Sequence, residues 1–184
     1  MKKLIYLFII FTSITVNSQI VDINAGHYMD LPAGVYKKDL NHTFDVFLGT
    51  WQYQNGNEIF EVRLDKAEHY LTDNNNYIDY IKGNYSYTID GGNTYITNTI
   101  DFNTSNNPND NSIFSARPLN QDELDLRFKD MVHNKNCKLL LKFLPNSTTQ
   151  LLFKLDNQFR VYVYPELSPN PGFSVPNHII LTKQ

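Results

Sequence analysis

The sequence predicts an all-β protein: an antiparallel meander of about 8–10 strands that closes into a barrel or, alternatively, folds as a β-sandwich. After residue 48, apolar and polar residues alternate almost throughout, as in the runs 60–65 and 124–129. Such alternation is typical of strands with one dry and one solvated face. Turn sequences such as Asn55-Gly56 and Asp90-Gly91 separate the runs, and they supply the positive φ angles that tight hairpins require.

A short helical lead-in is predicted from Asp39 to Phe47, directly before the first strand of the barrel. In that strand, Gly49 permits a tight backbone turn, and Trp51 supplies the largest apolar side chain available to plug one end of a sheet. We therefore expect Gly49 and Trp51 to form the structural opening of the barrel. The strands expected, in chain order, are 49–55, 58–66, 77–90, 94–101, 112–117, 122–131, 137–144, 149–156, 159–164 and 178–183. Because the longest of these can be bent, their number is an upper limit.

Residues 1–18 have the features of a secretory signal peptide. Lys2 and Lys3 form a basic start, an apolar run follows from Leu4 to Val16, and the small residue Ser18 precedes a cleavage point. The apolar run is shorter than the roughly 20 residues of a membrane-spanning helix. We expect export to the periplasm or the extracellular medium, with no integral membrane segment in the mature chain.

The mature chain is expected to form a single domain over residues 19–184, because no shift in composition and no internal repeat marks a second one. Two segments, 103–111 and 165–176, are predicted as loops because they are too polar or too rich in Pro to continue a strand.

The charge of the chain argues against nucleic acid as a partner. Without Lys2 and Lys3, the 16 basic residues become 14 against 19 acidic residues, a formal net charge of −5. A mildly acidic chain without a basic block offers no electrostatic attraction for nucleic acid or for an anionic membrane surface.

Cys137 is the one cysteine, so no internal disulfide can form. It alternates onto the same strand face as Leu139, Leu141 and Phe143. A free cysteine in such surroundings packs as a small apolar residue, and we expect core packing over reactivity.

The remaining candidates for chemistry are scattered. The five histidines, at positions 27, 42, 69, 133 and 178, lack the close spacing of a zinc site. The loop 103–111 could offer oxygens to Ca²⁺, but an exposed loop is the simpler interpretation. Asp122, Glu123 and Asp125 begin one strand and have the pattern of an outer barrel wall. We therefore expect no catalytic residue, no metal, no cofactor and no enzyme activity.

Aromatic residues are numerous, with 12 Tyr and 12 Phe, and on an exposed sheet face they could form a contact surface for sugars or proteins. Alternation places Tyr85 and Tyr87 on one face, and Tyr162 and Tyr164 on a face with Arg160. The simpler explanation is that Tyr suits strands, and it is favoured here.

Three segments, 31–40, 47–53 and 77–87, with Asn98-Thr99 after them, carry a resemblance to a known family. They contain a Pro-x-Gly-x-Tyr-x-Lys-Asp lead, a Gly-Thr-Trp strand and an Asp-x-x-x-Gly-x-Tyr-x-Tyr strand. The chain resembles an uncharacterised family of small secreted proteins of flavobacterial type, a domain of unknown function. The resemblance implies secretion and one β-rich domain, and it brings no known activity.

A wider resemblance, to lipocalin-like barrels, rests on Gly49, Trp51 and the run of hairpins. In lipocalins an Arg from late in the barrel typically stacks over the Trp. Arg160 is the one Arg late in this chain, but its strand position points it outward, and the characteristic Thr-Asp-Tyr turn is missing.

Two functions follow as hypotheses. The first is a secreted barrel that binds a small apolar or amphipathic ligand, since barrels of this size have room for one. Its inward faces would be formed by Phe60, Leu64, Leu126, Phe128, Leu139, Leu141 and Phe143. The alternative is a protein- or surface-interaction module without a ligand, which uses Tyr-rich outer faces or the loop 165–176.

Overall fold

The computed structural model describes residues 19–25, 31–100, 106–115, 118, 120–157 and 172–184. Its strands are β1 (Ile20–Asp22), β2 (Tyr36–Lys38), β3 (Gly49–Asn55), β4 (Glu58–Leu71), β5 (Tyr77–Thr88), β6 (Tyr95–Asn98), β7 (Ile113–Ser115), β8 (Glu123–Asp130), β9 (Lys135–Phe143), β10 (Gln150–Asn157) and β11 (Ile179–Lys183). Two 3-10 helices, η2 (Asp45–Phe47) and η3 (Pro108–Asp110), are each a single short turn. No helix in these ranges is long and apolar enough to cross a membrane.

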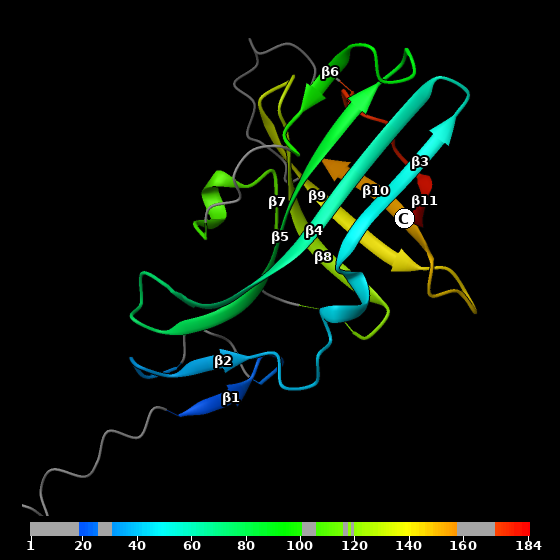
Figure 1. The fold of residues 1–184 in the computed structure, drawn as a ribbon. Coiled ribbons are helices and arrows are strands. Elements are labelled where there is room, and N and C mark those ends of the chain that lie inside the picture. The colour runs from blue at the N-terminus through cyan, green and yellow to red at the C-terminus, as the bar shows by residue number, and fades with distance from the viewer. Residues whose placement is uncertain (1–18, 26–30, 101–105, 116–117, 119, 158–171) are drawn as a thin grey trace, which may run out of the picture.

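Eight antiparallel strands close into a barrel, in the order β3, β4, β5, β7, β8, β9, β10 and β11 (Figure 1). The last strand returns to the first, where Thr182 pairs with Gln52 and Lys183 pairs with Trp51. The prediction of an all-β meander closed as a barrel is therefore confirmed, and the sandwich alternative is wrong.

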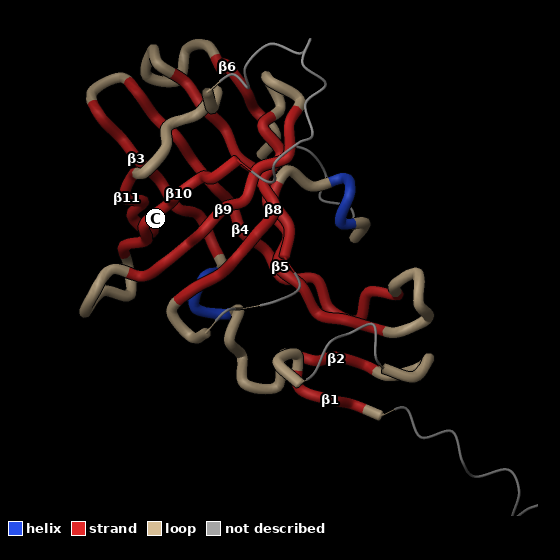
Figure 2. The backbone as a smooth tube through the Cα atoms, turned by 180° about the vertical axis from the view of Figure 1, so that it is seen from behind, coloured by secondary structure: helices blue, strands red, loops and turns tan. Residues whose placement is uncertain are grey.

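Strand β5 pairs with four other strands and so connects the barrel to the rest of the sheet. One of its edges pairs with β4, and the other edge pairs in turn with β2, β7 and β6. Near Tyr77 and Ile78 the short strand β2 runs parallel to β5, and β1 runs parallel to β2. These strands extend the sheet beyond the barrel, as the tube in Figure 2 shows.

The side chains that point into the barrel form one apolar core. Phe60, Val62 and Leu64 of β4 pack in it, and the Phe60 ring lies with its centroid 5.8 Å from that of Tyr85. Other strands contribute Leu124, Leu126, Phe128, Cys137, Leu139, Leu141, Leu151, Phe153, Leu155 and Leu181. The expected core packing of Cys137 is confirmed, since the thiol is free and buried.

The helical lead-in is shorter than predicted: only Asp45–Phe47 is helical, and the residues from Asp39 to Phe44 form turns. The carboxylate of Asp39 accepts hydrogen bonds from the backbone N–H groups of Thr43 (2.8 Å) and Phe44 (3.0 Å). These side-chain bonds offer the backbone an alternative to a regular helix.

Tyr85 and Tyr87 share a face as predicted, but this face is the interior and not an exposed contact surface. Tyr85 is fully buried, with its ring stacked 4.6 Å from that of Phe128. The Tyr87 hydroxyl donates a hydrogen bond of 2.7 Å to the carboxylate of Glu58. The predicted strand 159–164, with Arg160, Tyr162 and Tyr164, lies outside the described residues.

Candidate functional site

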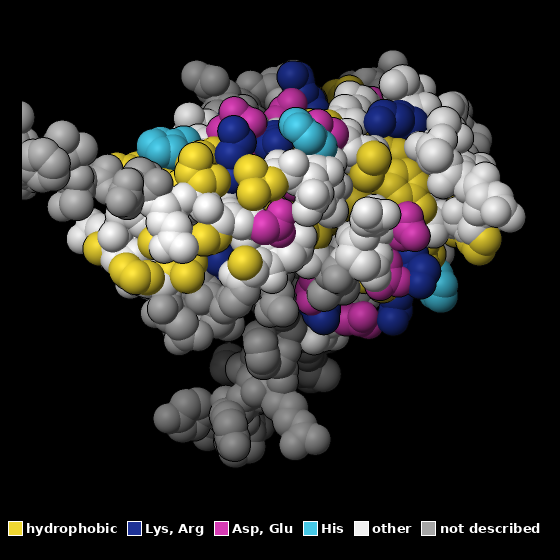
Figure 3. Space-filling model, turned by 90° about the horizontal axis from the view of Figure 1, so that it is seen from below, with side chains coloured by type: hydrophobic (Ala, Val, Ile, Leu, Met, Phe, Trp, Pro, Cys, Tyr) yellow, Lys and Arg dark blue, Asp and Glu magenta, His cyan; other side chains and the backbone are white. Residues whose placement is uncertain are grey.

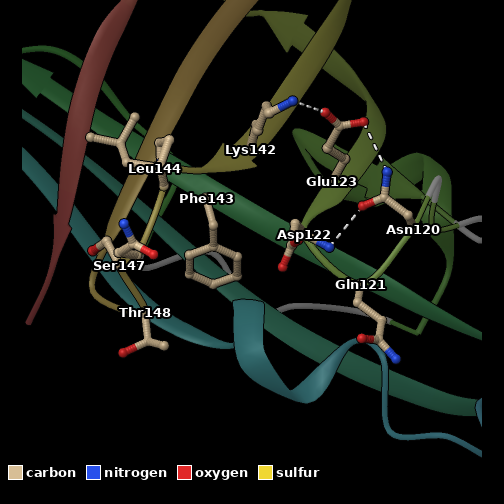
Figure 4. A pocket seen from close by; sticks show the side chains of 11 residues that line it. Asn120, Gln121, Asp122, Glu123, Lys142, Phe143, Leu144, Ser147 and Thr148 are labelled. Atoms are coloured by element: carbon tan, nitrogen blue, oxygen red, sulfur yellow. Dashed lines mark hydrogen bonds and ion pairs between the residues drawn. The ribbon is translucent and has the colours of Figure 1, made fainter.

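A cleft of about 990 Å³ lies at one end of the barrel, between the segment that leads into β8 and the loop that follows β9 (Figure 4). Most of its lining residues carry amide, hydroxyl or carboxylate groups. They are Asn120, Gln121, Asp122, Glu123, Lys142, Phe143, Leu144, Pro145, Asn146, Ser147 and Thr148.

Hydrogen bonds hold the two walls of the cleft in place. The Phe143 N–H donates to the Asp122 carbonyl at 3.0 Å, which joins one wall to the other. In the first wall, the Asp122 N–H donates to Asn120 Oδ1 at 2.8 Å. In the second, Ser147 Oγ accepts from the N–H groups of Thr149 (3.2 Å) and Gln150 (3.0 Å). Because these turns satisfy their own backbone groups, the cleft is formed before any ligand arrives.

The Phe143 ring forms the floor of the cleft and connects it to the barrel core. Its centroid lies 4.9 Å from that of Phe47 in η2 and 6.0 Å from that of Trp51. Trp51 is fully buried, and its Nε1–H donates to the Phe47 carbonyl at 2.8 Å. Gly49, two residues earlier, has a φ of 109°, which favours glycine.

A cation, Lys183 of β11, lies over Trp51, whereas Arg160 lies outside the described residues. Lys183 Nζ is 5.2 Å from the centroid of the Trp51 ring, and it donates to the carbonyl of Val46 at 3.3 Å. The lipocalin pattern has an arginine at this position, so the resemblance does not point to a lysine. Since the last two residues of β11 pair with β3, any long cation there can reach Trp51.

The cleft contains more acidic than basic side chains. Glu123 accepts hydrogen bonds from Lys142 and, at 3.0 Å, from Asn120 Nδ2. The bond from Lys142, with that from Asn120, holds the pKa of Glu123 below its ordinary value. Asp122 is exposed, and its carboxylate has no partner among the described residues. The lining thus contains two carboxylates and one cation, a net negative site.

Of the three acids expected on the outer wall, Glu123 and Asp125 lie on the outer face of β8, as predicted. Glu123 pairs with Lys142, and Asp125 pairs with Lys138 at 2.9 Å. Asp122 directly precedes the strand, and it lines the cleft together with Glu123. No lining residue in the described cleft places a nucleophile beside a base.

A second polar cluster joins β1 and β2 to the barrel. Asp79 is fully buried and accepts hydrogen bonds from the Tyr36 hydroxyl (2.5 Å), the Asp39 N–H (3.0 Å) and the His69 N–H (3.1 Å). Burial and the bond to Asp79 raise the pKa of Tyr36. Every group here has an internal partner, so the cluster serves the fold.

The four described histidines stay apart, and in the described ranges no group of three His, Cys, Asp or Glu side chains can hold a metal ion. His42 Nδ1 lies 3.0 Å from Asp45. The ring of His69 stacks on Tyr77 at 4.0 Å, and His133 lies near Asp130. His178 occupies a turn, and His27 falls outside the described part of the chain.

Seen from below, the lower end of the molecule carries hydrophobic side chains in separate regions, with acidic, basic and histidine side chains interspersed among them (Figure 3). Charges of both signs lie close together on this face. This face therefore presents no large area of a single sign of charge.

Comparison with known proteins gives one match. A family model described as a family of unknown function (DUF6705) matches residues 1–184. No curated protein and no solved structure matches the chain.

Proposed function

The chain belongs to the family of unknown function DUF6705, and we propose that it is an exported interaction module. The closed barrel is the scaffold, and the cleft defined by residues 120–123 and 142–148 is the contact surface. In this proposal the protein acts in the periplasm or outside the cell and catalyses no reaction. The observation that carries it is a cleft with both polar and apolar lining beside a densely packed barrel.

The packing of the interior supports a role as scaffold. Phe60, Leu64, Leu139 and Leu141 have no accessible surface, and Leu126 has 2%. A void large enough for a ligand would leave such side chains accessible. Where the interior is described, it is therefore filled by its own side chains.

The free groups of the cleft support a role in binding. Gln121, Asp122, Asn146 and Thr148 are all exposed. They offer amide, carboxylate and hydroxyl groups, which can satisfy both donors and acceptors of a partner. Because the surrounding turns are already ordered, little conformational entropy is lost when a partner binds.

A photo-crosslinking amino acid placed at Thr148 tests the proposal in the native host. We expect crosslinking to a partner of defined mass from position 148. The matched control is Asp73, an exposed residue between β4 and β5 at the far side of the molecule. Equal adducts from both positions, or none from position 148, would contradict a contact surface at the cleft.

A second candidate function is binding of a small apolar or amphipathic ligand inside the barrel, as in lipocalin-like proteins. Closed barrels of about this strand number can hold one small ligand, but here the described core side chains would have to move apart to admit it. Native mass spectrometry of the protein purified from its own compartment tests it. A reproducible extra mass that disappears on denaturation would support the carrier, and a bare mass would count against it.

A further inference from the structure

The acidic and basic groups of the cleft are not balanced. Glu123 is neutralised by Lys142, as the dashed lines in Figure 4 show. The Asp122 side chain extends from the opposite wall toward the side of the cleft that holds Phe143 (Figure 4). Its carboxylate is exposed, and no described residue pairs with it. Without Lys2 and Lys3 the chain has 14 basic against 19 acidic residues, a formal net charge of −5, so long-range electrostatics also favour a basic partner.

The remaining lining matches a long basic side chain. Phe143 is 9% exposed at the floor, and Leu144 and Pro145 adjoin it. The methylene stem of Arg or Lys lies well on such apolar surface while its charged end reaches polar groups. The lining also contains the side-chain oxygens of Gln121 and Thr148, which can accept hydrogen bonds.

We propose that the cleft binds a basic side chain of a partner protein, arginine in preference to lysine, with Asp122 as its counter-ion. The proposal rests on the interaction function proposed above and names the chemistry of the partner. Arginine has five donors in a planar fork, so one guanidinium can bind a carboxylate with two bonds and still donate to neighbouring amides.

Other occupants fit the same lining less well. A bare metal ion would need more acidic ligands than Asp122, because Glu123 is already paired. A neutral sugar would use the amides and hydroxyls but would leave the Asp122 charge uncompensated. A volume of about 990 Å³ accommodates an arginine together with its neighbours in an extended segment.

The test is an NMR titration of the labelled protein with a blocked tri-arginine peptide. The control peptide contains citrulline, the neutral isostere, in place of each arginine. We expect shifts of Gln121, Asp122 and Thr148 with the arginine peptide only, and these should weaken as salt is added. Asp122→Asn should weaken binding by about ten-fold or more, whereas Asp73→Asn, at the far side of the molecule, should leave it unchanged.

Equal binding of the citrulline peptide, or unchanged affinity of D122N, would overturn the assignment, and so would shifts confined to another face. The D122N variant should fold normally, since the Asp122 carboxylate makes no hydrogen bond or ion pair with another described residue. Crosslinking from position 148 separates the two proposals. Crosslinks whose yield is the same in D122N would preserve the interaction function and refute the basic partner.

Discussion

Gly83 lies at an inward position of β5, opposite Leu64 of β4. A Cβ atom at this position would lie 2.5 Å from the carbonyl oxygen of Arg63 and 2.7 Å from Leu64 Cδ2. The backbone oxygen is held by the sheet, so the strands would have to separate. We expect Gly83→Ala to lower the free energy of unfolding by about 1–3 kcal/mol, measured by urea denaturation. Gly172→Ala is the control, because nothing lies near its Cβ, and equal losses in both variants would contradict this explanation.

Single residues also show what alternation can and cannot predict. Cys137 could be assigned to the core because its face is shared with several apolar residues. Tyr85 and Tyr87 were placed correctly on one face, but Tyr is neither clearly apolar nor clearly polar. A period of two tells which residues share a face, and only the polarity of the set tells which face is inward. For these tyrosines the second signal was ambiguous.

At the scale of elements, Asp130 at the end of β8 attaches the segment that leads into β11. Its carboxylate accepts hydrogen bonds from Ser174 Oγ (2.6 Å), the Ser174 N–H (2.8 Å) and the His133 N–H (3.0 Å). Burial alone raises the pKa of Asp130, but the bonds from Ser174 and His133 outweigh it, and the pKa lies below its ordinary value. This stabilisation is fully present above the unfolded-state pKa of about 3.9 and is lost as pH falls through the lower folded-state pKa.

We therefore expect Asp130→Asn to lower the free energy of unfolding at neutral pH by about 1–3 kcal/mol, because the charge-assisted bonds are weakened. The difference from the unmodified protein should shrink below about pH 4. Urea denaturation at several pH values measures both effects. A difference that stays constant down to the most acidic pH would show that the Asp130 charge does not stabilise the attachment of β11.

The barrel strands could largely be predicted, because their alternation and their turns are local signals. Strands β1 and β2 could not, since three residues are too few to show alternation and their pairing depends on the free edge of β5. The two walls of the cleft, residues 120–123 and 142–148, lie at the open end of the hairpin β8–β9, so the predicted meander already brings them together. The shape of the cleft could not be predicted, because it depends on the conformations of the adjoining turns and on the bond from Phe143 N–H to the Asp122 carbonyl.

At the scale of the whole molecule, tyrosines that are protonated in the folded state make the stability of the barrel decrease at alkaline pH. Burial raises the pKa of Tyr80 and of Tyr87 to about 12 from an ordinary value of 10.0, and burial also raises the pKa of Tyr85. The folded state thus prefers the protonated phenols. The stability they contribute is fully present below pH 10 and is lost as pH rises from 10 toward 12.

We expect the urea concentration at the midpoint of unfolding to stay constant up to about pH 9 and to fall steeply above pH 10. Tyr80→Phe removes one of these phenols, whose hydroxyl donates to the Asn106 carbonyl at 2.6 Å. This variant should therefore be less stable at neutral pH but should lose stability less steeply above pH 10. Tyr95→Phe is the control. Because Tyr95 is 49% exposed, its replacement should not change how steeply stability falls with pH above 10. If both variants keep the original slope, the alkaline transition has a different origin, such as deprotonation of lysines that are ion-paired in the fold.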